Sequence, residues 1–152
     1  MLPMKSSYML ATIIDRHRNG GHMGTTTTQL EANKKLVLEF YDAMIGRKDF
    51  DAGRRYMGDT YRQHAPYATD GHAGLRAFVD WFRTSFPNHR YEIKRVLAEG
   101  DFVMLHVHGT GGPNPHGEAV VDIFRVENGK VVEHWDIIQP IPEKADNPNG
   151  MF

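Results

Sequence analysis

Hydrophobic residues recur at helical spacing in the first half of the chain. Thr28-Gln29-Leu30-Glu31 matches a capping box, in which a threonine and a glutamate bind the free amides at a helix start. The apolar residues that follow fall on one side of a helix: Leu30, Val37, Phe40, Tyr41 and Met44. This pattern predicts a first helix that ends near Gly46, because glycine is a common helix stop.

Two more helices are predicted before the middle of the chain. A short one covers residues 49–57 and is followed by a brief extended segment at 61–64 that enters the turn Ala65-Pro66. A longer one covers about 72–86 and ends at Pro87. Its buried stripe is predicted to be Leu75, Phe78, Val79, Phe82 and Phe86.

After Pro87 the apolar residues alternate instead, which predicts four long strands. They are expected over 90–98, 102–110, 119–126 and 131–139. Asn128-Gly129 is a strong hairpin signal, because these residues tolerate the positive φ angles of a type I′ turn. Helices first and strands later predict an α+β fold in the order α-α-β-α-β-β-β-β, with a curved antiparallel sheet. We expect a pocket between the concave face of the sheet and the helices.

Composition and charge narrow the class of protein. The 152 residues fit one domain, predicted over 29–152, after a poorly ordered N-terminal extension at 1–28. A net charge of −1 gives no field that favours nucleic acid or membrane lipid. No apolar run approaches the roughly 20 residues that span a bilayer. The absence of cysteine excludes a cysteine nucleophile and fits a cytoplasmic protein.

Polar residues interrupt the apolar faces of two predicted strands. Side chains alternate across a strand, so Phe102, Met104, His106 and His108 share one face of the second long strand. In the same way Val132, His134, Asp136 and Ile138 share one face of the last strand. If both faces point inward, three histidines and one carboxylate converge in the pocket.

Asp136 is the residue of this set for which burial has a chemical consequence. Burying a carboxylate costs several kcal/mol unless it is paired or takes up a proton. A neighbouring histidine would supply that partner, and the pair would transfer protons near neutral pH. Asp122 competes for the carboxylate role, or forms a structural ion pair with Arg125 or Arg95.

Other residues are expected to complete the pocket. His64 lies at the proline turn of 61–66 (YRQHAP), where loop residues often reach a pocket. The remaining predicted ligand-binding residues are His108, Phe102, Met104, Ile138, Phe40 and Phe82. Trp81 and Trp135 are interpreted first as core or interface aromatics.

A metal site is the alternative use of two of these histidines. Gly100 followed by His106-Val107-His108 matches the start of the cupin metal motif, but the positions for its glutamate hold Gly112 and Pro113. The helical first half also disagrees with a double-sheet barrel. His106 and His108 on one strand face could still hold a metal together with Asp136. The favoured prediction is a protein without metal or cofactor.

Four segments carry a resemblance to a known family. They are 33–41 (NKKLVLEFY), 61–66 (YRQHAP), 93–108 (IKRVLAEGDFVMLHVH) and 121–142 (VDIFRVENGKVVEHWDIIQPIP). Together they resemble the SnoaL-like family, within the wider group related to nuclear transport factor 2, over about 30–152. The resemblance implies a curved sheet wrapped by helices and a homodimer formed through the outer face of the sheet. Its members include polyketide cyclases that close a ring by aldol condensation without metal or cofactor, using a pocket aspartate that Asp136 matches best.

The leading hypothesis is a cofactor-free lyase or isomerase that acts on a small carbonyl compound. Asp136 would remove a proton next to the carbonyl, and His106 or His134 would hold or protonate the enolate oxygen. His108 or His64 would tune the site. Two alternatives stay open: a non-catalytic binder of a small apolar ligand, and a metal-dependent enzyme that uses His106 and His108. No nucleic acid or membrane partner is expected.

Overall fold

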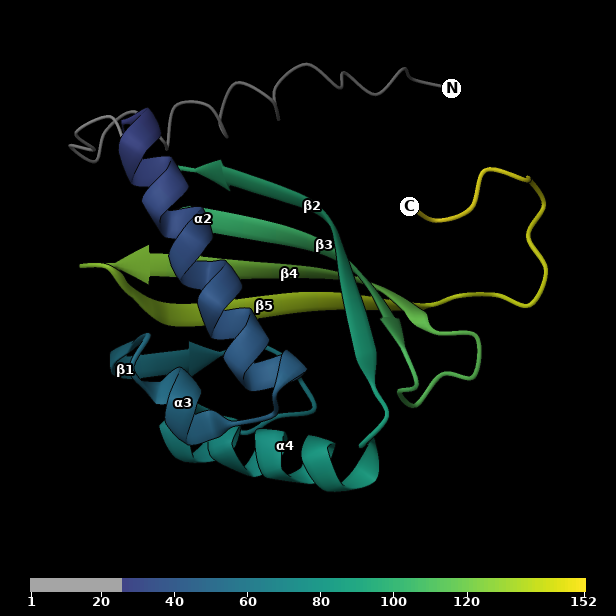
Figure 1. Cartoon of the computed structure of the whole chain (residues 1–152), viewed down its shortest axis with the longest axis horizontal. Coiled ribbons are helices and arrows are strands. Elements are labelled where there is room, and N and C mark those ends of the chain that lie inside the picture. Colours follow the sequence, from purple (N-terminus) through teal and green to yellow (C-terminus); the bar gives the residue numbers. More distant parts are fainter. Residues whose placement is uncertain (1–25) are drawn as a thin grey trace, which may run out of the picture.

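The computed structural model describes residues 26–152 as an α+β fold with one five-stranded sheet (Figure 1). The predicted extension at 1–28 lies outside the described residues as far as residue 25. The elements are α2 (Thr27–Tyr41), the π-helical turn η1 (Asp42–Gly46), α3 (Phe50–Arg54), β1 (Met57–Gln63), α4 (Gly71–Ser85), β2 (Arg90–Glu99), β3 (Phe102–Thr110), β4 (Glu118–Glu127) and β5 (Lys130–Pro140).

The N-cap of the first helix lies two residues before the predicted one. Thr26 is the N-cap, and its hydroxyl oxygen accepts a hydrogen bond of 3.2 Å from the amide of Gln29. The prediction of Thr28 as the cap is therefore wrong, and Thr28 lies inside α2. A run of four threonines offers the same capping oxygen at each position, so composition alone could not select one of them.

The sheet has the strand order β1-β5-β4-β3-β2 and is mixed. β2 to β5 form the predicted antiparallel meander, whereas β1 pairs with β5 in parallel. The prediction of a purely antiparallel sheet is wrong at this one strand. The predicted helix over 49–57 is also too long. The helix α3 ends at Arg54, and Met57 already pairs with Val131 as the first residue of β1.

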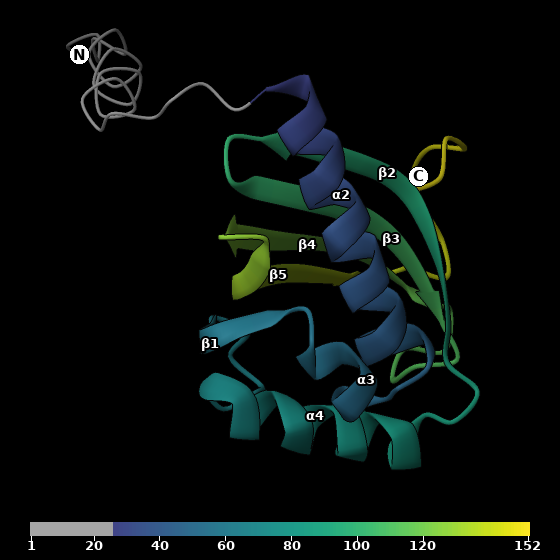
Figure 2. The same cartoon turned by 60° about the vertical axis from the view of Figure 1, so that its left-hand side comes forward.

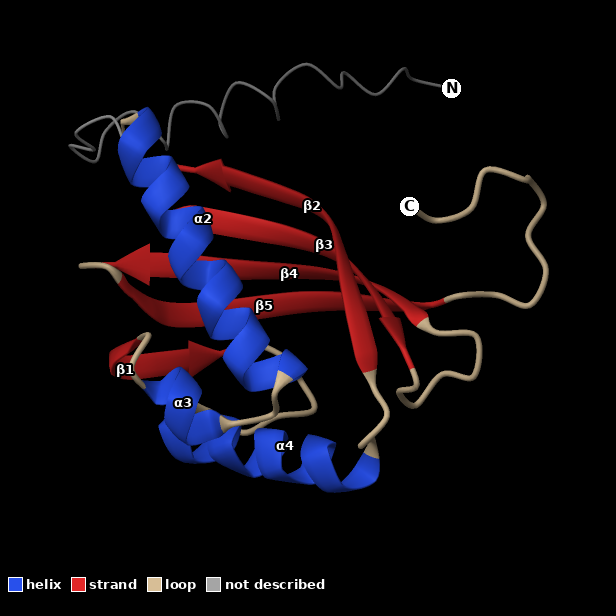
Figure 3. Ribbon diagram, viewed as in Figure 1, coloured by secondary structure: helices blue, strands red, loops and turns tan. Residues whose placement is uncertain are grey.

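The helices cover one face of the sheet and enclose the core. α2 crosses that face, and α3 and α4 lie below β1 in the views of Figures 1 and 2. Figure 3 shows the same division into a helical layer and a strand layer, with the C-terminal loop beyond the end of β5. Fully buried core side chains come from both layers and include Val37, Val79, Val103, Leu105 and Val131. No helix within the described part of the chain is long and apolar enough to span a membrane.

Strand register decides which side chains face the helices. Leu105 pairs with Asp122, and Asp122 pairs with Asp136, so these three positions lie side by side on the inner face. His106 pairs with Val121 on the opposite, outer face. The predicted convergence of His106 and His108 with Asp136 is therefore wrong, because the aliphatic face of β3 with Val103, Leu105 and Val107 is the buried one.

Candidate functional site

A cavity of about 500 Å³ lies between the inner face of the sheet and the helices. Its apolar walls include Ile45 of η1, Phe78, Trp81 and Phe82 of α4, and Val107, Val120 and Ile138 of the sheet. The polar side chains Asp122 and Asp136 lie on its floor. Tyr67, Trp81 and Ile138 are the most exposed large lining residues, which places the opening between α4 and the edge of β5.

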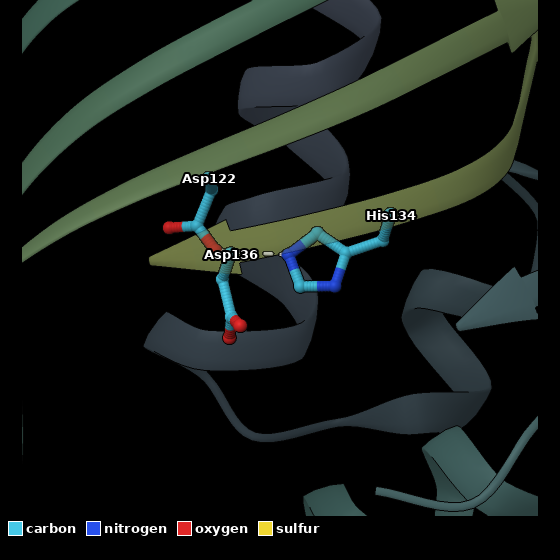
Figure 4. A group of neighbouring side chains, drawn as sticks. All are labelled: Asp122, His134 and Asp136. Atoms are coloured by element: carbon cyan, nitrogen blue, oxygen red, sulfur yellow. Dashed lines mark hydrogen bonds and ion pairs between the residues drawn. The ribbon is translucent and has the colours of Figure 1, made fainter. Parts of the chain in front are cut away.

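Asp122 and His134 form a buried hydrogen-bonded pair across β4 and β5 (Figure 4). His134 Nε2 lies 2.9 Å from Asp122 Oδ1, and His134 Nδ1 lies 2.8 Å from Gln63 Oε1. The amide of Ala65 donates to the same Gln63 oxygen at 3.0 Å, which fixes that atom as an acceptor. His134 Nδ1 is therefore the donor to Gln63, and His134 Nε2 is hydrogen-bonded to Asp122.

The second oxygen of Asp122 has no hydrogen-bond partner among the described residues. Asp122 is 5% exposed and lines the cavity, and its buried Oδ2 accepts no hydrogen bond. A buried polar atom without a partner carries a desolvation penalty of about 1–3 kcal/mol. A donor group on a bound ligand would remove that penalty.

Asp136 lies beside this pair and has no positively charged partner within the described chain. Burial raises the pKa of Asp136 from its ordinary value to about 6. The hydroxyl of Tyr67 donates a hydrogen bond to Asp136 Oδ2. With this pKa, a carboxylate is basic enough to take a proton from carbon, and its protonated form can return the proton near neutral pH.

Two buried tyrosines surround the carboxylates as neutral hydrogen-bond donors. Burial, followed by the nearby charge of Asp122, raises the pKa of Tyr41 well above its ordinary value. Burial, followed by the charges of Asp122 and Asp136, raises the pKa of Tyr61 in the same direction. Both phenols therefore keep their protons at any pH at which the protein works. Tyr41 lines the cavity.

Five of the predicted site residues lie at the cavity. Asp136, Ile138 and Phe82 line its main part. Phe40 and His134 line a small inner extension of about 50 Å³ that shares Tyr41, Asp122 and Asp136 with it.

The other five predicted site residues lie elsewhere. His106 Nδ1 contacts Arg95 Nη1 at 2.9 Å on the outer face, and the ring of His108 packs against Phe152. Met104 and Phe102 line shallow grooves on that face. His64 stacks on Trp135 at 4.7 Å.

The alternative metal site is also wrong as predicted, since His106 and His108 face away from Asp136. The structure brings together a different set of donors. Single ligand atoms of Asp122, His134 and Asp136 all lie within 4.8 Å of one another, the one such group among residues 26–152. An imidazole and two carboxylates could hold a divalent cation such as zinc or manganese. In the structure, a hydrogen bond of 2.9 Å already links His134 to Asp122, two of these three groups.

The prediction gave no role in the site to several residues that line the cavity. Tyr41 was assigned to the helix stripe, Tyr67 lies in the turn after Pro66, and His89 and Glu118 flank predicted strands. Asp122 was weighed as a second carboxylate or as a partner of Arg125 or Arg95, and its partner is His134. The sequence feature that points to Asp122 is that it is the one acidic residue between the apolar Val120 and Phe124 on the same strand face.

Solved structures share this fold. A candidate polyketide cyclase from Bacillus cereus is 23% identical, with a TM-score of 0.62 over 74% of this chain and 78% of that one. A candidate hydroxylase from Streptomyces galilaeus is 25% identical, with a TM-score of 0.60 over 72% of this chain and 90% of that one. A candidate ketosteroid isomerase from Kribbella flavida is 22% identical, with a TM-score of 0.60 over 80% and 85%. No curated protein matches the chain.

These neighbours agree on the curved sheet with its helical cover and differ in the activities ascribed to them. Fold likeness alone therefore does not transfer an activity. The sequence itself is more specific, because the family model of SnoaL-like polyketide cyclases matches residues 35–145. The match covers the C-terminal part of α2, the whole of α4 and all five strands. The resemblance expected from the sequence is thus confirmed, and the chain belongs to the SnoaL-like polyketide cyclase family.

Proposed function

We propose that the protein is an acid/base enzyme that removes a proton next to the carbonyl group of a small, largely apolar compound. The observation that carries this proposal is the position of Asp136, a carboxylate with a pKa of about 6 on the floor of an apolar cavity. A carboxyl group with such a pKa is half ionised at about pH 6 and mostly ionised at neutral pH, so it can both take up a proton and return it. Membership of a family of polyketide cyclases supports the same class of chemistry.

The proposed reaction starts with one proton transfer. An oxygen of Asp136 takes the proton from the carbon next to the carbonyl, and the electron pair of the broken C–H bond forms an enolate. The phenol of Tyr41, which is buried and neutral, donates a hydrogen bond to the enolate oxygen. The enolate carbon then attacks a second carbonyl of the same molecule, and protonated Asp136 returns its proton to the new alkoxide, which completes the bond-forming step of an aldol condensation. In a conjugated substrate the dienolate instead takes the proton back from Asp136 at another carbon, which is an isomerisation.

His134 acts in this proposal through Asp122. Both ring nitrogens of His134 are engaged, one with Gln63 and the other with Asp122, so neither is free to hold the enolate directly. The hydrogen bond to His134 holds Asp122 in place beside Asp136, and Asp136, which has no such partner, acts as the base.

Proton exchange tests this proposal without knowledge of the natural substrate. In heavy water, the enzyme is expected to speed the exchange of the methyl protons of para-acetylbiphenyl, followed by NMR. Asp136→Asn is expected to abolish the enhancement. Asp59→Asn, the same change at an exposed aspartate of β1, is the matched control. Undiminished exchange by Asp136→Asn would disprove the proposed role of Asp136.

Non-catalytic ligand binding is the second candidate function. The aromatic and aliphatic walls favour it, because such a cavity binds a flat apolar molecule without any chemistry. In that case para-acetylbiphenyl would bind equally well to the wild type and to Asp136→Asn, and neither would exchange its protons.

We also propose that two copies of the chain associate through the outer face of the sheet. This face exposes Leu97 by 53%, Phe102 by 44% and Ile137 by 60%, and large exposed apolar groups that lie together mark interaction sites. Sedimentation velocity is expected to show a dimer for the wild type and a monomer for Phe102→Asp. A monomeric wild type would contradict this proposal.

A further inference from the structure

The floor of the cavity is polar at both ends and apolar between them. Three rows of paired residues cross β3, β4 and β5 on the inner face. One end row contains Asp122 and Asp136, and the middle row is Val107, Val120 and Ile138. The other end row contains Gly109 and Glu118. Asp122 and Glu118 are four residues apart on β4, which is about 13 Å along a strand.

Glu118 is a buried carboxylate that the proposed reaction does not use. It is 7% exposed, and its Oε2 accepts a hydrogen bond of 2.7 Å from Asn114 Nδ2. No hydrogen bond or ion pair engages Oε1 within the described residues. A Cβ atom at Gly112 would lie 2.9 Å from this oxygen. The glycine thus leaves space around Oε1 that a side chain would fill.

His89 lies next to Glu118 at the same end of the cavity. It is 7% exposed, and neither ring nitrogen forms a hydrogen bond within the described chain, although Nδ1 is buried. A Cβ atom at Gly109 would lie 3.2 Å from His89 Nε2 and 3.3 Å from Glu118 Cγ, so both side chains meet above this glycine. Burial, followed by the charges of Lys48 and Arg90, lowers the pKa of His89 to about 4. At neutral pH the ring is therefore an uncharged donor and acceptor.

We propose that His89 and Glu118 form a second binding site within the cavity, which takes a hydroxyl group at the end of the ligand opposite the carbonyl. A hydroxyl can accept a hydrogen bond from His89 Nε2–H, the ring nitrogen on the side of Glu118, and donate one to Glu118 Oε1, so it engages both side chains at once. Placing the carbonyl at the far end rests on the proposed function. The ligand class is a rigid apolar molecule with a carbonyl at one end and a hydroxyl at the other.

A carboxylate or phosphate does not fit this second site. An anionic group would lie against the carboxylate of Glu118, and like charges in a buried site repel strongly. Lys48 does not reverse this, because its ammonium group contacts the backbone oxygen of His89 at 3.5 Å and lies outside the cavity lining. The site therefore distinguishes a neutral hydroxyl from an anion of similar size.

Calorimetric titration with three matched probes tests the second site on the wild-type protein. The probes are para-acetylbiphenyls that carry a hydroxyl, a hydrogen or a carboxylate at the far para position. The hydroxyl probe is expected to bind about tenfold more tightly than the hydrogen probe, as one to two buried hydrogen bonds allow. The carboxylate probe is expected to bind more weakly than both. Equal affinities for the hydroxyl and hydrogen probes, or no binding of the hydroxyl probe, would overturn the proposal.

Glu118→Gln tests the charge directly. This variant keeps an acceptor oxygen and loses the negative charge. The ratio of the affinities for the hydroxyl and carboxylate probes, called the gap below, is therefore expected to shrink about tenfold. Glu143→Gln, the same change at an exposed glutamate after β5, is expected to leave the gap unchanged. An unchanged gap in Glu118→Gln would contradict the assignment to Glu118.

The two proposals fail separately in these experiments. If the hydroxyl probe binds as expected but its methyl protons do not exchange, the second site stands and the proposed reaction is wrong. If all three probes bind alike and exchange depends on Asp136, the reaction stands and the second site is wrong. Near-ultraviolet circular dichroism of each variant identifies loss of fold.

Discussion

Glu133 and Asp136 are two acids three residues apart on β5, and the protein shifts their pKa values in opposite directions. Burial alone would raise the pKa of Glu133, but hydrogen bonds from His64 and Arg125 outweigh it and lower the pKa. Asp136 has no cation beside it, so burial acts alone and raises its pKa to about 6. One acid is therefore held as a structural anion, and the other is left ready to exchange protons.

The two faces of the sheet differ in the same way as these two acids. On the outer face Arg125 forms an ion pair of 2.8 Å with Glu133. On the inner face Asp122 interacts with His134 and the neutral Tyr41, and Asp136 with the neutral Tyr67. Glu133 and Asp136 thus look alike in sequence, and the Arg125 guanidinium beside Glu133 is what distinguishes its environment from that of Asp136.

The largest expected effect is on catalysis. Asp136→Asn is expected to lower the rate of proton exchange of the acetylbiphenyl probe by about a hundredfold to ten-thousandfold, the usual contribution of a general base. Glu133→Gln is expected to keep the rate within about twofold of the wild-type rate, because that carboxylate lies on the outer face, where it binds Arg125. NMR in heavy water measures both rates. Comparable losses in both variants would remove the distinction between the two acids.

The next effect is on stability. His134→Ala leaves Asp122 buried without its partner, and breaking a buried pair in this way is expected to lower the free energy of unfolding by about 3 kcal/mol. His108→Ala on the outer face removes a ring contact with Phe152 and is expected to cost less than about 1 kcal/mol. Urea denaturation measures both. Equal losses would show that the Asp122–His134 pair contributes little to the fold.

Most of the fold was predictable because local rules agree with it. The alternation of β2 to β5 and the hairpin at Asn128-Gly129 follow from the sequence, and these two residues adopt φ angles of 51° and 68° as the turn requires. The parallel pairing of β1 with β5 was not predictable in the same way. It joins segments more than 60 residues apart, and no short-range pattern encodes such a contact.

The candidate site was only partly predictable. The alternation of side chains divides a strand into two faces, but it does not show which face points toward the helices. In β3 the fully aliphatic face with Leu105 proved to be the buried one, and the face with His106 the outer one. In β5 a bulge opposite Arg125 and Val126 changes the register, so Val131 and Val132 are both buried. Asp136 was correctly placed at the cavity, whereas its neighbour Asp122 was identified only as a competing possibility.

The two acids of β5 are also expected to give opposite pH dependences of stability. A carboxyl with a raised pKa binds its proton more tightly in the folded state, so Asp136 makes the wild type lose stability as the pH rises from about 4 to 6. The stability of Asp136→Asn relative to the wild type should therefore increase over this range. Glu133 has a lowered pKa, so its contribution is present above its ordinary value of 4.5 and is lost below it.

The measurement is urea denaturation of the wild type, Asp136→Asn and Glu133→Gln at several pH values between 3 and 8. The free energy of unfolding of Glu133→Gln should approach that of the wild type as the pH falls. The free energy of unfolding of Asp136→Asn should increase relative to that of the wild type as the pH rises. Parallel curves for the two variants would show that the cations around Glu133 do not separate it from Asp136.

The smallest effect is expected at the C-terminus, where Phe152 packs on the outer face. The centre of its ring lies 4.5 Å from that of His108 and 5.4 Å from that of His106, and Phe152 is not among the residues that line the cavity. Phe152→Ala should therefore shift the imidazole NMR signals of His106 and His108, leave that of His134 unchanged, and lower stability by less than about 1 kcal/mol. A shift of the His134 signal would mean that the two faces communicate through the sheet, and the separation between structural and chemical histidines would then be incomplete.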